Sequence, residues 1–180
     1  MRVITGTARG RKLCTPENYD IRPTTDNVKE SIFNIIQFDI EGRRVLDLFA
    51  GTGQLGIECL SRGAESCVFV DESREAVRIV KENLKTCNLK GTVLQMDALS
   101  FLRTAGTFDL IFIDPPYDSK LYEPALEIIN LVDILSDGGI IVCEARKECV
   151  LPEMRAPYRK RREYSYGKLK VCTYVKDASL

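Results

Sequence analysis

The sequence of 180 residues contains no histidine and no tryptophan. Without histidine, imidazole-based acid–base catalysis and histidine metal ligation are excluded. No stretch approaches the roughly 20 apolar residues of a membrane-spanning helix, and the first residues lack the apolar core of a signal peptide. We therefore expect a cytoplasmic protein that does not contact a membrane. With 44% apolar residues, the chain suits one globular unit with a sizeable core.

The cysteines exclude a second set of protein classes. There are seven, an odd number, and none of them forms a C-x-x-C pair. Several lie within apolar runs, where a free cysteine behaves as a small hydrophobic side chain. A reduced protein without structural zinc, and without any bound metal, is the simplest expectation.

The net charge of zero conceals an uneven distribution. Residues 1–12 sum to +4 and residues 155–170 to +6, so the rest of the chain carries −10. Two basic segments on an acidic body favour local contact with phosphates, although solvated surface charge is the alternative. The candidate RNA-binding residues in these segments are Arg9, Arg11, Lys12, Arg159, Lys160, Arg161 and Arg162.

A glycine-rich loop follows the first strongly apolar strand, residues 44–49. Gly51, Gly53 and Gly56 match the pattern G-x-G-x-x-G, which by itself is weak evidence for a dinucleotide site. Asp47, within the strand, argues against a dinucleotide as the ligand, because a carboxylate would repel a pyrophosphate. It suits a ligand that carries an ammonium or sulfonium group, as S-adenosylmethionine (SAM) does. Alternatively, Asp47 only caps the loop.

Two further carboxylates end the next strands. Asp71 follows the strand 66–70, where a carboxylate can accept hydrogen bonds from ribose hydroxyls. Asp97, followed by Ala98, ends the strand 92–96, where a side chain can accept from an adenine amine. Each could instead cap a helix, but acidic residues at successive strand ends favour a nucleotide-like ligand.

The tetrapeptide Asp114-Pro115-Pro116-Tyr117 follows the apolar run 110–113. A carboxylate and a proline carbonyl can accept both hydrogens of an exocyclic amine, and a tyrosine ring can stack on a base. This pattern makes Asp114, Pro115 and Tyr117 the candidate catalytic residues. An ordinary turn after a strand is the alternative.

Strand-like and helix-like segments alternate from residue 44 onward, which indicates an α/β fold. We predict a Rossmann-like domain with a seven-stranded, mostly parallel sheet that ends in an antiparallel hairpin with its turn at 165–167. The remaining expected strands are 110–113, 139–144, 158–164 and 168–176. The expected helices are 25–38, 55–62, 73–87, a short one after residue 97, and 122–135.

Residues 1–40 are expected to be an extension of the methyltransferase domain 41–180. We predict a short strand pair around 3–13, followed by the helix 25–38. The extension could contact RNA and close over the cofactor, with Arg22 or Thr24 near the methionine carboxylate. The alternative is an ordinary capped amphipathic helix.

The order of four motifs resembles one family. The motifs are Gly10-Arg11-Lys12-Leu13, Arg22-Pro23-Thr24-Thr25-Asp26 with Val28-Lys29-Glu30, the segment 47–53, and Asp114-Pro115-Pro116-Tyr117. Together they resemble the RsmD family of bacterial guanine-N2 methyltransferases of 16S rRNA. The glycine loop and the D-P-P-Y motif are shared with many amino-methyltransferases, whereas the R-P-T-T-D segment narrows the resemblance to this family.

The resemblance implies the cofactor and the partner. SAM would be bound by Gly51, Thr52 and Gly53, with Asp71 at the ribose, Asp97 and Ala98 at the adenine, and Thr24 near the methionine end. The partner would be small-subunit rRNA or an assembling 30S subunit, gripped by the arm and the hairpin, and a monomer is expected. Three other interpretations remain open: an adenine-N6 methyltransferase of RNA or DNA, a non-catalytic binding module, and a nicotinamide-dependent oxidoreductase.

Overall fold

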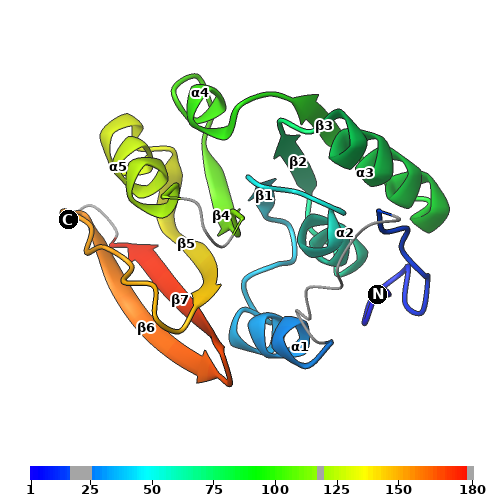
Figure 1. The fold of residues 1–180 in the computed structure, drawn as a ribbon, viewed down its shortest axis with the longest axis horizontal. Helices are drawn as coiled ribbons and strands as arrows, with labels where there is room; N and C mark the ends of the chain where they lie inside the picture. The colour runs from blue at the N-terminus through cyan, green and yellow to red at the C-terminus, as the bar shows by residue number, and fades with distance from the viewer. Residues whose placement is uncertain (17–25, 117–119, 178–180) are drawn as a thin grey trace.

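The computed structural model of the protein describes residues 1–16, 26–116 and 120–177 (Figure 1). The helices are α1 (Asp26–Ile35), α2 (Gln54–Ser61), α3 (Arg74–Cys87), α4 (Ala98–Leu102) and α5 (Tyr122–Val132). The strands are β1 (Arg44–Asp47), β2 (Ser66–Asp71), β3 (Thr92–Gln95), β4 (Phe108–Ile113), β5 (Leu135–Arg146), β6 (Tyr158–Tyr166) and β7 (Leu169–Lys176). They form one seven-stranded sheet in the order β3-β2-β1-β4-β5-β7-β6.

The predicted α/β fold is confirmed. Strands β1 to β5 run parallel, and β7 pairs antiparallel with both β5 and β6. The central strands are apolar along their length because a parallel sheet is covered on both faces. In β4, the residues from Leu110 to Ile113 are at most 1% exposed.

Helices cover the two faces of the sheet, and each face has its own core. Helices α1, α2 and α3 pack on one face, and α4 and α5 on the other (Figure 1). The first 40 residues share the first of these cores, in which Phe33 of α1 packs against Phe112 of β4 at 6.2 Å between ring centroids. Val3 and Leu13 are buried in the same cluster. The N-terminal segment therefore contributes to the main core.

The predicted N-terminal strand pair is present only as a minimal antiparallel pairing, with hydrogen bonds between Val3 and Arg11 and between Leu13 and Met1. The pairing centres on a single antiparallel bridge, Arg2 with Lys12. A longer ladder does not form because the amides of Ile4 and Thr5 donate to the carboxylate of Glu58 in α2. The helix predicted for 25–38 is also shorter, since α1 ends at Ile35.

The helix predicted for 122–135 ends earlier than expected. Asp133 adopts a left-handed conformation with φ of 59°, which terminates α5 at Val132. Strand β5 then begins at Leu135, which pairs with Phe108, and not at residue 139. The run of apolar residues gave no sign of this change from helix to strand.

The C-terminal hairpin is present, but its turn lies further along the chain than 165–167. Strand β6 continues to Tyr166, which pairs with Leu169 of β7. Only Gly167 and Lys168 connect the strands, and Gly167 has a positive φ of 59°. Glycine suits this position because it adopts positive φ without steric cost.

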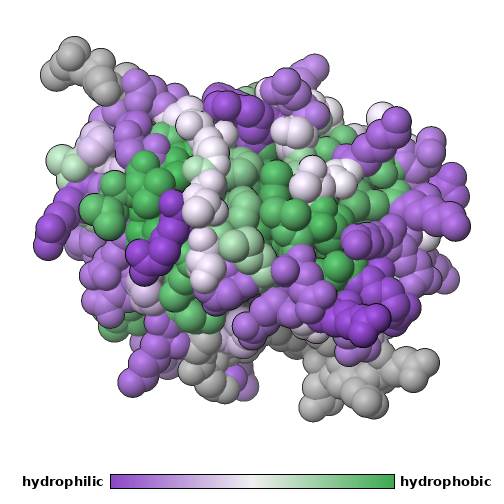
Figure 2. Space-filling view, turned by 90° about the horizontal axis from the view of Figure 1, so that it is seen from above, coloured by the Kyte–Doolittle hydropathy of each residue, from purple (hydrophilic) through white to green (hydrophobic). Residues whose placement is uncertain are grey.

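Figure 2 shows the face at the top of Figure 1, where a band of apolar residues crosses between hydrophilic margins. Met96 after β3 and Leu131 in α5 are among the large apolar side chains that are exposed. An apolar surface is a poor match for phosphate groups, which are bound by basic side chains.

The strand order places a functional site. The chain moves from β1 outward through β2 to β3, and then returns to β4 on the other side of β1. In open α/β sheets, ligands bind beside such a reversal, outside the carboxyl ends of the strands. The residues that follow β1, β2, β3 and β4 are therefore the first to examine.

Candidate active site

A cavity of about 860 Å³ lies at this edge of the sheet. Seven of the residues predicted from the sequence line it: Asp47, Gly51, Thr52, Asp71, Asp97, Ala98 and Asp114. They come from the ends of four different strands and from the loops that follow them. The structure therefore brings the predicted cofactor and catalytic residues together around one cavity.

Two carboxylates hold the glycine loop in place. The amide of Gly51 donates to Asp71 Oδ2 at 2.9 Å, and the amide of Gly56 donates to Asp47 Oδ2 at 3.0 Å. Gly53 begins α2 with φ of 76°, and a Cβ there would lie 3.2 Å from Val80. Gly53 therefore supports the shape of the loop, while its neighbours line the cavity.

The pKa of Asp47 is unusually high for a carboxylate. Its side chain is 2% exposed, and burial raises its pKa to about 7, an effect only partly offset by the hydrogen bond from Gly56. The negative charge of nearby Asp71 raises the pKa further. A cationic group bound in the cavity would favour the ionised form of Asp47.

Asp71 and Asp97 also serve the backbone around them. Asp71 Oδ1 accepts from the amide of Ser73, next to the start of α3, at 2.9 Å. Asp97 caps α4 by accepting from the amide of Ser100 at 2.8 Å, and these hydrogen bonds lower its pKa. Both side chains line the cavity as well, so their hydrogen bonds to the backbone do not exclude a ligand-facing role.

The candidate catalytic turn lies directly after β4. Asp114 is half-buried, Pro115 is buried, and Pro116 is exposed and lines the cavity. Tyr117 lies outside the described residues, as do Arg22 and Thr24. Of the predicted amine-binding pair, Asp114 lines the cavity that the glycine loop also lines, and the buried Pro115 follows it directly in the chain.

One wall of the cavity comes from a segment that the sequence did not indicate. Cys14, with the next two residues, lines the cavity. Asn83 of α3 accepts from the amide of Cys14 at 2.6 Å and donates to the carbonyls of Cys14 and Thr52 at 3.1 and 2.9 Å. Asn83 is fully buried in the apolar stripe of α3, between Val80 and Leu84. A polar residue in that stripe was the available signal.

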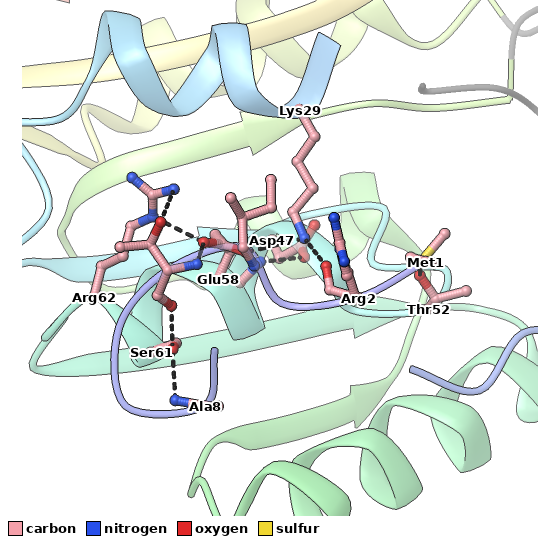
Figure 3. A network of polar contacts seen from close by, with 12 residues as sticks. Met1, Arg2, Ala8, Lys29, Asp47, Thr52, Glu58, Ser61 and Arg62 are labelled. Atoms are coloured by element: carbon pink, nitrogen blue, oxygen red, sulfur yellow. Dashed lines mark hydrogen bonds and ion pairs between the residues drawn. The ribbon is translucent and has the colours of Figure 1, made fainter. Parts of the chain in front are cut away.

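A second anchor holds the N-terminal segment against α2 (Figure 3). Glu58 is fully buried and accepts from the amides of Ile4 and Thr5 at 2.8 and 2.9 Å. It also pairs with Lys29 of α1 at 3.0 Å and with Arg62 at 2.9 Å. Burial alone would raise the pKa of Glu58, but these partners more than compensate and lower it. The carboxylate thus joins the N-terminal segment to two helices.

The candidate RNA-binding residues differ in their surroundings. Arg9, Arg11 and Lys12 are exposed on the N-terminal segment. In β6, Arg159 pairs with Asp177 at 3.0 Å, and Lys160 pairs with Glu153 at 2.8 Å and donates to the carbonyl of Leu151. The guanidinium of Arg162 lies over the ring of Tyr164 at 5.3 Å, and Arg161 is exposed.

The fold and the cavity define a Rossmann-like methyltransferase of the SAM-dependent class. The family model described as "Conserved hypothetical protein 95" matches residues 1–175. The chain is 44% identical to "Putative rRNA methyltransferase YlbH" of Bacillus subtilis, covering 98% of this chain and 99% of that one. It is 34% identical to "Ribosomal RNA small subunit methyltransferase D" of Escherichia coli, covering 99% of this chain and 91% of that one.

The solved structure "Putative methyltransferase yhhF from Escherichia coli" superposes with a TM-score of 0.87 at 32% identity, covering 99% of both chains. The chain belongs to the RsmD family. Among the described residues, no helix is both long and apolar enough to cross a bilayer. In the same part of the chain, no three His, Cys, Asp or Glu side chains group in a way that could hold a metal ion.

Proposed function

We propose that this protein transfers a methyl group from SAM to the exocyclic N2 amine of a guanine in 16S rRNA. The observation that carries the proposal is the position of Asp114, directly before Pro115, at the cavity that the glycine loop lines. A base amine held by this pair would lie next to a cofactor held by Gly51 and Asp71. The family relationship supports ribosomal RNA as the substrate.

The cavity suits SAM in both size and chemistry. Pockets for ligands of this size usually measure roughly 300–1,000 Å³, and this one is about 860 Å³. Asp47 would face the cationic methionine end, Asp71 the ribose, and Asp97 with Ala98 the adenine. Thr24, outside the described residues, is proposed to border the methionine carboxylate.

The chemistry asked of the protein is modest. When bound, SAM would supply an electrophilic methyl group, and the amine nitrogen would bond to it as the bond between methyl and sulfur breaks. The amine is a weak nucleophile because its lone pair is delocalised into the base. Hydrogen bonds to Asp114 and the Pro115 carbonyl would turn that lone pair toward the methyl group. The nitrogen becomes acidic after transfer, so its proton can leave to solvent without a strong base.

Positioning and electrostatics should provide most of the rate enhancement. Correct alignment of two reactants is worth about 7–11 kcal/mol, and a preorganised hydrogen-bond partner about 3–4 kcal/mol. Tyr117 is proposed to stack on the base and to keep it out of its helix. In this mechanism the catalytic residues bind and orient, and none of them forms a covalent intermediate.

An adenine-N6 methyltransferase would use the same arrangement, because adenine also presents a ring-attached amine. A nicotinamide-dependent oxidoreductase fits the cavity less well, since the pyrophosphate would lie near the carboxylate of Asp47. We place the protein in the cytoplasm, acting as a monomer on rRNA or on an assembling 30S subunit. Arg9, Arg11, Lys12 and Arg22 are proposed to contact the RNA from the N-terminal side.

The test is methyl transfer from labelled SAM to three substrates: small subunits that lack the modification, protein-free 16S rRNA, and duplex DNA. The product nucleoside is then identified by mass spectrometry. Label in N2-methylguanosine from subunits or rRNA is expected. Label in N6-methyladenine, or in DNA alone, would overturn the proposed specificity, while NAD binding in place of SAM would overturn the class.

A further inference from the structure

The two ends of the C-terminal hairpin lie at opposite ends of the strands. Its turn lies at the edge of the sheet formed by the carboxyl ends of the parallel strands, and its other end lies at the edge formed by their amino ends. Strand β6 runs in the same direction as β5, because both pair antiparallel with β7. Tyr166 is level with Leu169 and therefore with Arg146, three residues beyond the row of Ile113 and Cys143. The turn of the hairpin is thus on the same edge as Asp114, which follows Ile113.

Arg159, at the start of the basic run, lies toward the other edge, whereas Arg162, at its end, pairs with Thr173 and is level with Phe112, one residue before the end of β4. Arg159 is level with Val175 and therefore with Ile140, which pairs with Leu110. At about 3.3 Å per residue, this row is roughly 10 Å behind the end of β4, whereas the turn is roughly 10 Å beyond it. Along the strand direction, a base held at Asp114 is therefore nearer the turn than Arg159.

Much of the charge of the basic run is also neutralised within the protein. Arg159 pairs with Asp177, and Lys160 with Glu153, and both acids lie outside the basic sequence window. Lys176, at the same end of the hairpin, pairs with Asp133 at 2.9 Å and with Asp137. The net positive charge around the basic run is therefore lower in the folded protein than the sequence of that run suggests.

The turn carries a compact basic surface. The amide of Lys147 donates to the carbonyl of Lys168 at 2.9 Å, so these two lysines emerge from adjacent backbone. Both side chains are exposed, and Tyr164 and Tyr166 of β6 are half-exposed nearby. Ammonium groups bind phosphates as point charges, and aromatic rings stack on unpaired bases.

The geometry points to Lys147 and Lys168 as an RNA-binding surface that contacts phosphates flanking the target base. This inference rests on the proposed function and specifies where the RNA lies. The turn, with the loop after β5, is the RNA-facing part of the hairpin. The basic run at 159–162 chiefly stabilises the far end of the hairpin.

Three double variants with equal loss of charge test this assignment. The turn variant is K147Q/K168Q, and the far-edge variant is R159Q/R161Q. The control is K85Q/K90Q, whose exposed lysines lie at and after the end of α3. Steady-state KM for undermethylated subunits, kcat, the dissociation constant of S-adenosylhomocysteine (SAH), and filter binding to 16S rRNA are measured for each at several salt concentrations.

We expect the turn variant to raise KM for subunits at least about fivefold and to reduce the salt dependence of RNA binding by about one to two ionic contacts. SAH binding should stay the same in all three variants. A far-edge effect equal to or larger than the turn effect would overturn the assignment, as would a turn variant that matches the control. If the unmodified enzyme transfers no methyl group to subunits or rRNA, the proposed function itself fails.

Discussion

The side chain of Asn83 hydrogen-bonds to both the amide and the carbonyl of Cys14, at 2.6 and 3.1 Å. It thereby pairs with a peptide backbone as a neighbouring strand would. Its third hydrogen bond, to the carbonyl of Thr52, connects the same side chain to the glycine loop. Residues 14–16 form a wall of the cavity, so Asn83 couples that wall to the loop opposite.

Replacing Asn83 should therefore weaken cofactor binding. We expect Asn83→Ala to raise the dissociation constant of SAH about tenfold, and to cost about 1–3 kcal/mol of unfolding free energy because buried backbone groups lose their partners. Asn83→Asp retains the acceptor for Cys14 but loses both donated hydrogen bonds, and should weaken binding similarly. Isothermal titration calorimetry and denaturant unfolding measure the two effects.

Thr86→Ala, on the exposed face of the same helix, is the control for Asn83 and should change neither quantity. Unaltered SAH affinity in a folded Asn83→Ala protein would show that the wall does not depend on this side chain.

Asp114 is expected to act in transfer and not in cofactor binding. Asp114→Asn retains the shape of the side chain but replaces one acceptor oxygen with a donor. We expect kcat to fall about 100- to 1,000-fold, the loss typical for one preorganised hydrogen-bond partner, while SAH affinity changes less than about threefold. Single-turnover kinetics together with SAH titration separate the two. Parallel loss of both would assign Asp114 to the cofactor.

Cofactor affinity should depend on pH through Asp47. Its pKa is raised to about 7, above that of an unfolded aspartate, so its neutral form favours folding and this stabilisation is lost as pH rises through about 7. Binding of a cationic methionine end needs the ionised form. We therefore expect SAM affinity to rise severalfold from pH 6 to pH 7.5, where the amine remains mostly protonated.

Asp47→Asn should bind SAM weakly, with affinity that is almost constant over the same pH range. A wild-type protein whose affinity is also constant across this range would show that Asp47 is not the counter-charge.

Glu58 should contribute strongly to stability. Glu58→Gln removes the charge that balances buried Lys29, and breaking a buried ion pair costs about 3–5 kcal/mol. Glu82→Gln breaks an exposed pair with Arg78 and should cost less than about 1 kcal/mol. Because the pKa of Glu58 is lowered, its contribution is present above the ordinary value of 4.5 and is lost as pH falls through the folded value. Urea unfolding at pH 7 and pH 4 measures both effects.

The parts of the site that could be predicted from the sequence are those that follow strands. Buried parallel strands produce apolar runs, and the carboxyl ends of such strands meet at one edge of the sheet. Asp47, Asp71, Asp97 and Asp114 could therefore be placed together from their spacing alone. The α/β class followed from the alternation of strands and helices.

Contacts between distant segments could not be predicted in this way. The link between Asn83 and Cys14 spans 69 residues, and the link between Ile4 and Glu58 spans 54. Neither leaves a periodic pattern in the sequence. The ion pairs of Arg159 and Lys160 could not be predicted for a related reason, because their acidic partners lie outside that stretch of sequence. The end of α5 depends on the backbone conformation of Asp133, which does not alter apolar periodicity.

The Glu58 network has a consequence for the rate at which the N-terminal segment exchanges its amide hydrogens. Terminal residues usually fray and exchange within the shortest times. The amides of Ile4 and Thr5 instead donate to a carboxylate with no solvent-accessible surface (Figure 3). These two amides can reach solvent only when the segment separates from α2. That separation removes hydrogen-bond partners from the buried charges of Glu58 and Lys29. Although it lies at the periphery in Figure 1, this segment should open together with the core of the protein.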